Sequence, residues 1–256
     1  MSDLAALAHT VDDAARTARA IPQLSKDVAL SVEDAYKVQK LSIDQRLARG
    51  EKLIGIKMGL TSRAKMAQMG VEEVIWGRLT DTMLVEDGDE IAFGSYVHPR
   101  AEPEIAFLLK EPLEGPVSVV QALNAVAALA PAVEIIDSRY ENFKFSLPDV
   151  IADNSSSSSF VLGPWSAPDI DVANLGMVME FDGKPVQIGS SAAILGHPGR
   201  SLAAASRLVA QSGLRLEAGW IVMAGGATAA EALRPDSHVR NVVEKLGSAS
   251  FAVSGK

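Results

Sequence analysis

Three glutamates interrupt otherwise apolar stretches of the chain. Glu102 and Glu104 stand two positions apart within residues 101–109, and Glu134 interrupts residues 132–136. Residues i and i+2 of a β-strand point to the same face of the sheet, so Glu102 and Glu104 would face the same way. Carboxylates are costly to bury without a partner, and neighbouring ones repel each other. We therefore expect the three to bind a divalent cation, Mg²⁺ or Mn²⁺ rather than Zn²⁺, because every ligand is a hard oxygen.

The alternative to a metal site is a set of ordinary ion pairs. Glu102 could pair with Arg100 or Lys57. Glu134 could pair with Arg139, and Glu104 could lie on a solvated face. Structural ion-pair networks produce similar patterns, so these residues alone leave both interpretations open.

Composition narrows the classes of protein and of partner. The chain has 256 residues, of which 48% are hydrophobic and 22% charged, which is typical of a globular protein with one sizeable core. A net charge of −8 argues against nucleic acid or an anionic membrane as partner. The absence of cysteine excludes thiolate catalysis and cysteine-bound zinc. The N-terminus does not resemble a signal peptide and no apolar run is long enough to span a membrane, so we expect a cytoplasmic protein.

The elements that would position the glutamates are many short strands and a few helices. The first fifty residues have a helical pattern, with a capping box at residues 31–34 and a stop at Gly50. Strands are predicted at residues 53–60, 90–93, 101–109, 132–137, 159–162, 177–181, 185–188, 220–224 and 250–253, with a hairpin turn at Asp182-Gly183 and helices at residues 63–69, 117–129 and 201–211. This order lacks regular βαβ alternation and predicts an α+β or mainly-β roll. We expect a single catalytic domain over residues 1–256, with a helical subregion at 1–50 and a β-rich metal-binding core at 51–256.

Three further segments are candidates for chemistry. Lys57 lies within a predicted strand and could either extend to the surface or face a cavity, where it would hold an anion or act as a general acid. Asp153-Asn154 and the five serines that follow could form a solvated loop or a mobile segment that closes over a substrate. Gly225-Gly226 follows an apolar run and could direct backbone amides at a ligand or simply form a sharp turn.

Four segments, taken together and in this order, resemble a known family. They are residues 55–62, 98–107, 133–139 and 152–156, and the combination of Glu-x-Glu with Glu-Ile-x-Asp-Ser-Arg is specific. The chain resembles, over almost its whole length, the hydratase/decarboxylase branch of the fumarylacetoacetate hydrolase superfamily, which serves meta-cleavage degradation of aromatic compounds. The resemblance implies an α+β fold with a mixed β roll or barrel. It also implies Mg²⁺ or Mn²⁺ held by Glu102, Glu104 and Glu134.

The resemblance favours decarboxylation over hydration. In the hydratases of this branch an aspartate usually precedes the aromatic residue of an Asp-Phe-Gly stretch, whereas here Ile75 precedes Trp76. We therefore expect metal-dependent conversion of 2-oxohex-3-enedioate to 2-hydroxypenta-2,4-dienoate and CO₂. The alternatives are hydration of 2-hydroxypenta-2,4-dienoate, a C–C hydrolase of the fumarylpyruvate type, and a metal-free scaffolding subunit.

The same resemblance assigns roles to individual residues. Lys57 is expected to be catalytic, stabilising an enolate oxygen or transferring a proton. The residues expected to bind the substrate are Leu60, Ile75, Asn154 and Ser156. We also expect an apolar pocket around Ile75 and Trp76 to desolvate the departing carboxylate. The implied partners are a small dicarboxylate substrate, the hydratase of the same pathway, and further copies of the chain in a homo-oligomer.

Overall fold

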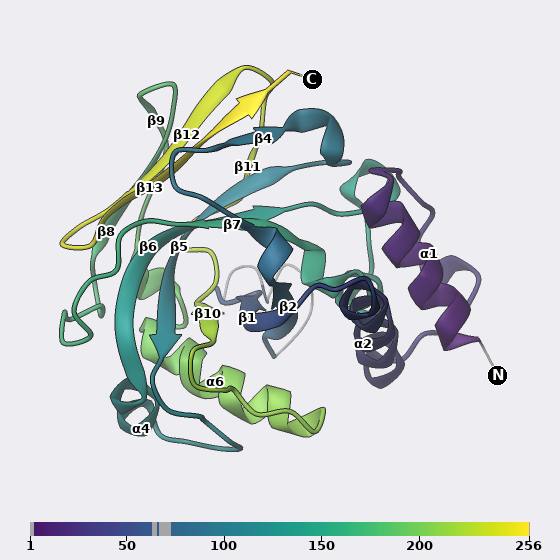
Figure 1. Cartoon of the computed structure of the whole chain (residues 1–256), viewed down its shortest axis with the longest axis horizontal. Helices are drawn as coiled ribbons and strands as arrows, with labels where there is room; N and C mark the ends of the chain where they lie inside the picture. The colour runs from purple at the N-terminus through teal and green to yellow at the C-terminus, as the bar shows by residue number, and fades with distance from the viewer. Residues whose placement is uncertain (1–2, 63–65, 67–72, 256) are drawn as a thin grey trace.

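The computed structural model of the chain describes residues 3–62, 66 and 73–255. Two β-sheets form the body of the molecule, and helices lie along two of its sides (Figure 1). The predicted helix over residues 63–69 lies outside the described residues. Within the described part of the chain, no helix combines the length and the apolar character that a membrane span requires.

Two of the helices occupy the N-terminal region, where the sequence predicts helical structure. The α-helices are α1 (Leu4–Arg16), α2 (Val32–Ala48), α4 (Val119–Asn124), α5 (Leu147–Ala152) and α6 (Pro198–Gln211). Helix α2 begins after Ser31, whose hydroxyl accepts a hydrogen bond of 3.0 Å from the Asp34 amide, as the capping pattern predicts. Gly50 follows its end with φ of +105°. Helices α1, α2 and α5 pack together around a small apolar core that includes Val11, Val38 and Ile151.

The larger sheet has eight strands, in the order β2-β1-β10-β5-β6-β7-β3, with β11 paired to β5. Their bounds are β1 (Leu53–Gly59), β2 (Ile75–Thr80), β3 (Leu84–Val85), β5 (Arg100–Leu109), β6 (Val126–Ile136), β7 (Ser157–Leu162), β10 (Ile221–Met223) and β11 (Glu231–Ala232). The pairs β1–β10 and β3–β7 are parallel and the others antiparallel, so the sheet is mixed. In Figure 1 the long strands β5 and β6 curve around β1 and β2.

The smaller sheet packs against the larger one. Its strands are β4 (Glu90–Ala92), β8 (Gly176–Phe181), β9 (Lys184–Ser190), β12 (Ser237–Val243) and β13 (Gly247–Ser254), in the order β4-β13-β12-β8-β9. The turn between β8 and β9 is the predicted Asp182-Gly183 hairpin, and both residues have positive φ, of +53° and +73°. An apolar core that includes Val133, Phe181 and Phe251 lies between the two sheets.

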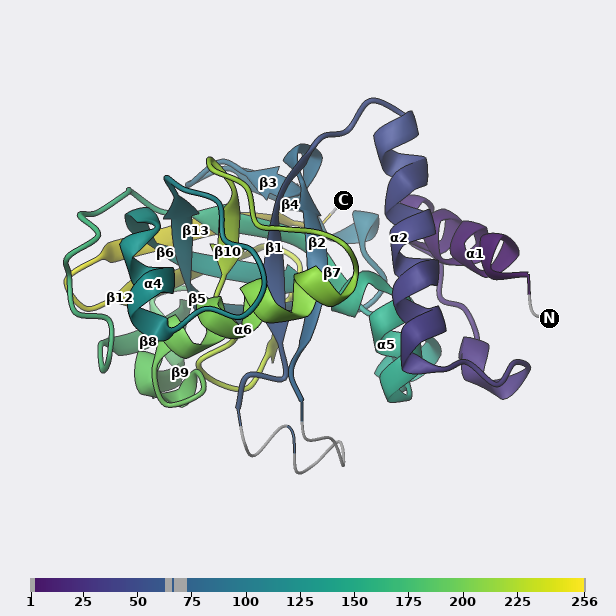
Figure 2. The ribbon, with the colours of Figure 1, turned by 90° about the horizontal axis from the view of Figure 1, so that it is seen from below.

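Helices α4 and α6 cover another part of the larger sheet (Figure 2). Ile56 and Met58 of β1 and Phe107 of β5 belong to the core that α6 closes with Leu202 and Val209. Successive side chains of a strand point to opposite faces. The residues between these apolar ones, Lys57 among them, therefore face the other side of the sheet.

The prediction from the sequence differs from the structure in the segment that leads from β5 into β6. The helix predicted over residues 117–129 is confirmed only in part: α4 covers Val119–Asn124, and β6 begins at Val126. Alanine and leucine favour helices, but this preference amounts to less than about 1 kcal/mol per residue, and pairing along the whole of β5 outweighs it. Strands β2, β3, β11 and β12 were not predicted. The combination of helices with two mixed sheets is the predicted α+β class.

Candidate metal centre and active site

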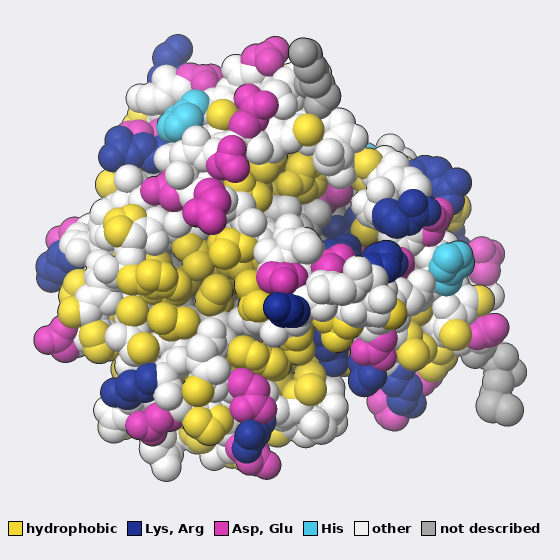
Figure 3. Space-filling model, viewed as in Figure 1, with side chains coloured by type: hydrophobic (Ala, Val, Ile, Leu, Met, Phe, Trp, Pro, Cys, Tyr) yellow, Lys and Arg dark blue, Asp and Glu magenta, His cyan; other side chains and the backbone are white. Residues whose placement is uncertain are grey.

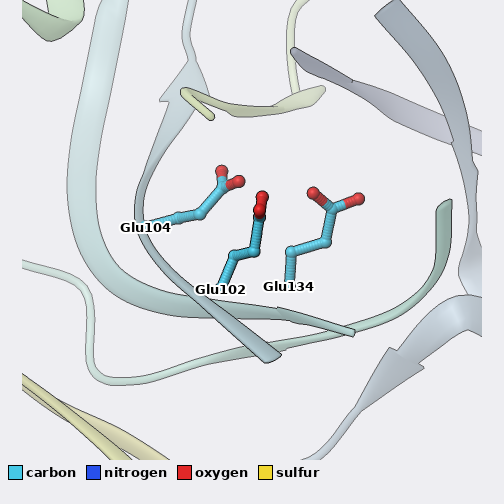
Figure 4. Close-up of side chains that lie close together, drawn as sticks. All are labelled: Glu102, Glu104 and Glu134. Carbon is cyan, nitrogen blue, oxygen red and sulfur yellow. The ribbon is translucent and has the colours of Figure 1, made fainter. Parts of the chain in front are cut away.

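The three glutamates of the sequence pattern form one cluster. Glu102 and Glu104 lie on β5 and Glu134 on β6, and the register of the two strands places Glu102 directly opposite Glu134. Each contributes a carboxylate oxygen to a group whose members all lie within 4.8 Å of one another. Figure 4 shows the three side chains rising from the two strands to the same side, with their carboxylates close together.

These carboxylates are buried. Glu104 and Glu134 are 0% exposed and Glu102 is 8% exposed, so the solvated face considered for Glu104 is wrong. Burial, and next the charges of Glu134 and Glu102, raise the pKa of Glu104 well above its ordinary value. Burial likewise raises the pKa of Glu134. Among the described residues, Oε1 of Glu104 finds no hydrogen-bond partner.

Lys57 supplies a positive charge to this cluster. Its Nζ lies 2.9 Å from Oε1 and 3.1 Å from Oε2 of Glu134, and the residue is 3% exposed. Extension to the surface is therefore wrong for Lys57, and so is the pairing of Glu134 with Arg139. Arg139 instead pairs with Asp153, which accepts hydrogen bonds from its guanidinium and from its backbone amide.

The Gly225-Gly226 turn packs directly on the carboxylates. The amide of Gly225, whose φ is +105°, donates a hydrogen bond of 2.8 Å to Oε2 of Glu104. A Cβ atom on Gly226 would lie only 2.6 Å from Oε2 of Glu102. The glycines are thus required for close approach, and the Gly225 amide orients one of the three carboxylates.

A cavity of about 380 Å³ lies next to the cluster. It is lined by Lys57, Gly59, Leu60, Ile75, Arg100, Glu102, Ile136, Phe143, Phe145, Val150, Ser155, Ser156, Ala229 and Ala230. Of the residues expected to bind substrate, Leu60, Ile75 and Ser156 therefore line one cavity together with Lys57. The hydroxyl oxygen of Ser156 is buried and, among the described residues, has no hydrogen-bond partner.

Asn154 does not line this cavity. Its side-chain amide is engaged with the backbone of Arg78, accepting from the amide and donating to the carbonyl, both at 2.8 Å. The serine-rich segment is not a solvated loop, because Asp153, Asn154 and the next three serines are all buried. Ser155 donates a hydrogen bond of 2.8 Å to the carbonyl of Trp76. The segment is therefore fixed against β2.

Trp76 does not line this cavity either. Ile75 and Trp76 are neighbours on β2, so their side chains point to opposite faces. Ile75 lines the cavity, whereas the Trp76 ring stacks on Tyr36, with the ring centroids 5.4 Å apart. The prediction of an apolar pocket built from both residues is wrong for Trp76. The apolar wall beside Ile75 comes from residues such as Phe143 and Phe145.

Arg100 is a charged cavity residue that sequence reasoning missed, since it was considered only as a partner of Glu102. Its guanidinium carbon lies 4.2 Å from the centroid of the Phe143 ring, and both residues line the cavity. A signal was present, because Arg100 stands two positions before Glu102 and so shares its face of β5. No comparable signal marks Phe143, which reaches the cavity from a turn outside the strands.

The charges of the cluster suit a divalent cation. Three glutamates and Lys57 carry formal charges of −3 and +1, a sum of −2, and one divalent cation would bring this sum to zero. All three glutamates offer hard oxygen ligands, and among the described residues the buried Oε1 of Glu104 has no hydrogen-bond partner. The residues present therefore fit a bound Mg²⁺ or Mn²⁺, and the neighbouring cavity would give a ligand access to it.

Comparison with known proteins agrees with this site. The family model described as fumarylacetoacetate (FAA) hydrolase C-terminal matches residues 55–254. The chain therefore belongs to the fumarylacetoacetate hydrolase family, as its motifs predict. Within that family it is 59% identical to a 4-oxalocrotonate decarboxylase of Pseudomonas sp., over 98% of both chains. A 2-hydroxyhexa-2,4-dienoate hydratase of Comamonas testosteroni is 33% identical over 93% of both chains.

A solved structure shares the whole fold. The 4-oxalocrotonate decarboxylase from Pseudomonas putida G7, complexed with magnesium and adipate, superposes with a TM-score of 0.95 at 40% identity, covering 98% of this chain and 97% of that one. The predicted mixed β architecture of the family is thereby confirmed.

Proposed function

We propose that this chain is a metal-dependent carboxy-lyase that converts 4-oxalocrotonate (2-oxohex-3-enedioate) to 2-hydroxypenta-2,4-dienoate and CO₂ in the degradation of aromatic compounds. The observation that carries the proposal is the buried cluster of three glutamates with Lys57 beside a cavity, in a chain that is 59% identical over its length to a 4-oxalocrotonate decarboxylase. Hydratase relatives are more distant, at 33% to 40% identity, which does not favour hydration.

Glu102, Glu104 and Glu134 would hold Mg²⁺ or Mn²⁺. When bound, the cation supplies Lewis-acid stabilisation for negative charge on the 2-oxo acid end of the substrate. The magnesium and adipate in the Pseudomonas putida G7 enzyme support this assignment, because adipate is a six-carbon dicarboxylate of the same chain length as the proposed substrate. The Gly225 amide holds Glu104 in position for this role.

The reaction breaks the bond between C5 and C6 of the substrate. The electron pair of that bond moves through the C3–C4 double bond to the 2-oxo oxygen, and CO₂ leaves. Lys57 lies beside the carboxylates, so its ammonium is within reach of a 2-oxo group bound there and would stabilise the oxygen or donate a proton to it. Ser156 offers a free hydroxyl to the substrate, and Arg100 offers a positive charge to one of its carboxylates.

The apolar wall of the cavity favours loss of CO₂ over addition of water. Ile75, Ile136 and Phe145 surround part of the cavity, and a carboxylate among them is less well hydrated than in water, whereas CO₂ is neutral. Among the described lining residues Glu102 is the one carboxylate, and it belongs to the metal cluster. Hydration needs a group that positions and activates water, and Ile75 cannot do this.

The proposal extends to assembly and location. We propose that the chain forms a homo-oligomer, associates with the hydratase that consumes its product, and works in the cytoplasm. Figure 3 shows a continuous area of hydrophobic side chains around β5, β6 and β10, a feature that often marks an interaction surface. Light scattering of the purified protein, alone and mixed with the hydratase, tests both associations.

The deciding experiment measures CO₂ release from 2-oxohex-3-enedioate with Mg²⁺ and with EDTA, and hydration of 2-hydroxypenta-2,4-dienoate in parallel. We expect metal-dependent CO₂ release without hydration of the dienoate. Ile75→Asp should reduce CO₂ release at least about tenfold, because it places a charge where the leaving carboxylate is held, while Ile75→Val should retain most of the activity. Hydration by the wild type without CO₂ release would overturn the proposal.

A further inference from the structure

A second cavity lies on the other side of β2 from the catalytic one. Its volume is about 440 Å³, within the range of about 300–1,000 Å³ that is typical of small-molecule sites. It is lined by Val32, Glu33, Tyr36, Lys37, Lys40, Trp76, Arg78, Leu208, Gln211 and Ser212. Figures 1 and 2 show the elements involved, with α2 and the C-terminal end of α6 both near β2.

Arg78 places a buried positive charge in this cavity. The residue is 4% exposed, and its guanidinium carbon lies 4.6 Å from the centroid of the Trp76 ring. One of its nitrogens donates to the side chain of Gln39, and among the described residues no carboxylate lies within ion-pair distance of it. Burial lowers the pKa of Arg78 to about 10, so the group is still protonated at neutral pH. A buried charge without a counter-ion is costly, which points to an anionic partner.

The neighbouring charges limit how much negative charge that partner carries. Lys37 pairs with Glu33 at 2.9 Å, and Lys40 pairs with Asp44 at 2.6 Å. Both lysines are therefore paired, whereas Arg78 is the cation without an ion pair among the described lining residues and feels only the more distant carboxylate charge of Asp44. One positive charge suits a monoanion better than phosphate, which carries more charge. A guanidinium also matches the planar geometry of a carboxylate.

The remaining walls favour an apolar, flat body on that anion. Val32 and Tyr36 of α2, Leu208 of α6 and Trp76 of β2 supply the apolar part of the lining. The space is larger than a bare carboxylate needs. We propose that this second cavity binds an aromatic carboxylate, with the carboxylate group on Arg78 and the ring between the apolar side chains of α2 and α6. The proposal is independent of the proposed catalytic function.

Isothermal titration calorimetry of the Mg²⁺-loaded protein with benzoate tests this proposal. Arg78→Gln removes the cation, and Gln211→Trp fills the cavity from an exposed position. If Arg78→Gln does not fold, Gln211→Trp still tests whether benzoate binds in this cavity. Arg234→Gln is the matched control, because this exposed arginine also stacks on an aromatic ring, that of Phe181, but lies outside the cavity. Ser156→Ala changes the catalytic cavity and so detects benzoate that binds there instead.

We expect both cavity variants to weaken the binding of benzoate at least about tenfold, the loss that corresponds to about 1.4 kcal/mol. Arg234→Gln and Ser156→Ala should bind it as the wild type does, and inorganic phosphate should bind more weakly than benzoate. Three results would overturn the proposal. They are no binding to the wild type, unchanged binding in the folded cavity variants, and a loss of binding in Ser156→Ala alone, which would place benzoate in the catalytic cavity.

Discussion

Lys57 and Glu134 stand 77 positions apart in the sequence and form a buried ion pair, with Nζ 2.9 Å and 3.1 Å from the two carboxylate oxygens. They reach each other because β1 and β6 belong to the same curved sheet and both side chains point to the face that carries the other two glutamates. The pair therefore joins the group expected to act on the substrate to one of the expected metal ligands. Lys57 lowers the pKa of that ligand, while burial raises it.

Replacing Lys57 separates catalysis from metal binding. In Lys57→Met the cluster loses the positive charge of Lys57 and becomes more negative, so we expect Mg²⁺ to bind at least as tightly as to the wild type. Turnover should nevertheless fall about 100-fold or more, because the reaction loses its acid or electrostatic partner. Calorimetry and CO₂ release measure the two effects, and Lys52→Met, on the surface beside β1, is the control. Near-normal turnover in Lys57→Met would rule out a catalytic role.

Glu104→Gln should have opposite effects on the metal-free and metal-loaded protein. Without metal, the substitution removes one of three crowded buried carboxylates, so we expect the melting temperature in EDTA to stay the same or rise. With Mg²⁺, the stabilisation by ligand should largely disappear, because the affinity falls at least about tenfold. Melting temperatures with and without Mg²⁺ measure both effects. Glu180→Gln on β8 is the control, and a full Mg²⁺ shift in Glu104→Gln would contradict the metal assignment.

Asn154 and Ser156 should respond differently to alanine. Asn154→Ala leaves two buried backbone groups of Arg78 without partners, which costs about 1–3 kcal/mol of folding free energy. Ser156→Ala should leave the stability unchanged and raise KM about fivefold, the equivalent of one hydrogen bond of about 1 kcal/mol. Asn142→Ala, at an exposed asparagine that also has positive φ, is the control for the first. A KM effect confined to Asn154→Ala would mean that the roles are reversed.

The buried pair of Asp153 and Arg139 should give a measurable pH dependence. Burial raises the pKa of Asp153 from 3.8 to about 6, even though Arg139 opposes the shift. A carboxyl group whose pKa is higher in the folded than in the unfolded chain binds extra protons when folded, so its stabilising contribution is present at low pH and is lost as the pH rises through 6. We expect the wild type to lose stability relative to Asp153→Asn between pH 4 and pH 7.

Urea unfolding of the two Mg²⁺-loaded proteins across this range gives the difference in free energy. Asp171→Asn, at an exposed position, provides the baseline. A difference that grows in favour of the wild type with rising pH would mean that Arg139 controls the pKa of Asp153.

Strand alternation made much of the cluster of three glutamates and Lys57 predictable. It places Glu102 and Glu104 on one face of β5 and separates Lys57 from Ile56 and Met58, which pack under α6. It did not give the register of β5 and β6, which puts Glu102 opposite Glu134, because register depends on the packing of the whole sheet. The partner of Lys57 was unpredictable for the same reason.

The errors in predicting which residues line the cavity have local causes as well. Asn154, Ser155 and Ser156 all have positive φ, of +49°, +54° and +59°, so their side chains do not alternate as in a strand. Asn154 consequently points at β2 while Ser156 faces the cavity, and a polar composition gave no hint that the segment is buried. The lining role of Phe143 also depends on a left-handed backbone, with φ of +56°.

The placement of all three glutamates on β5 and β6 has a consequence for how the chain reaches its native state. These strands are neighbours in sequence and pair over most of their length, so their hairpin needs no distant part of the chain in order to form. It nevertheless brings like charges together before Lys57 of β1 can arrive. Refolding should therefore be faster at millimolar Mg²⁺ than in EDTA, and acidification, which neutralises the carboxylates, should narrow the difference between the two rates.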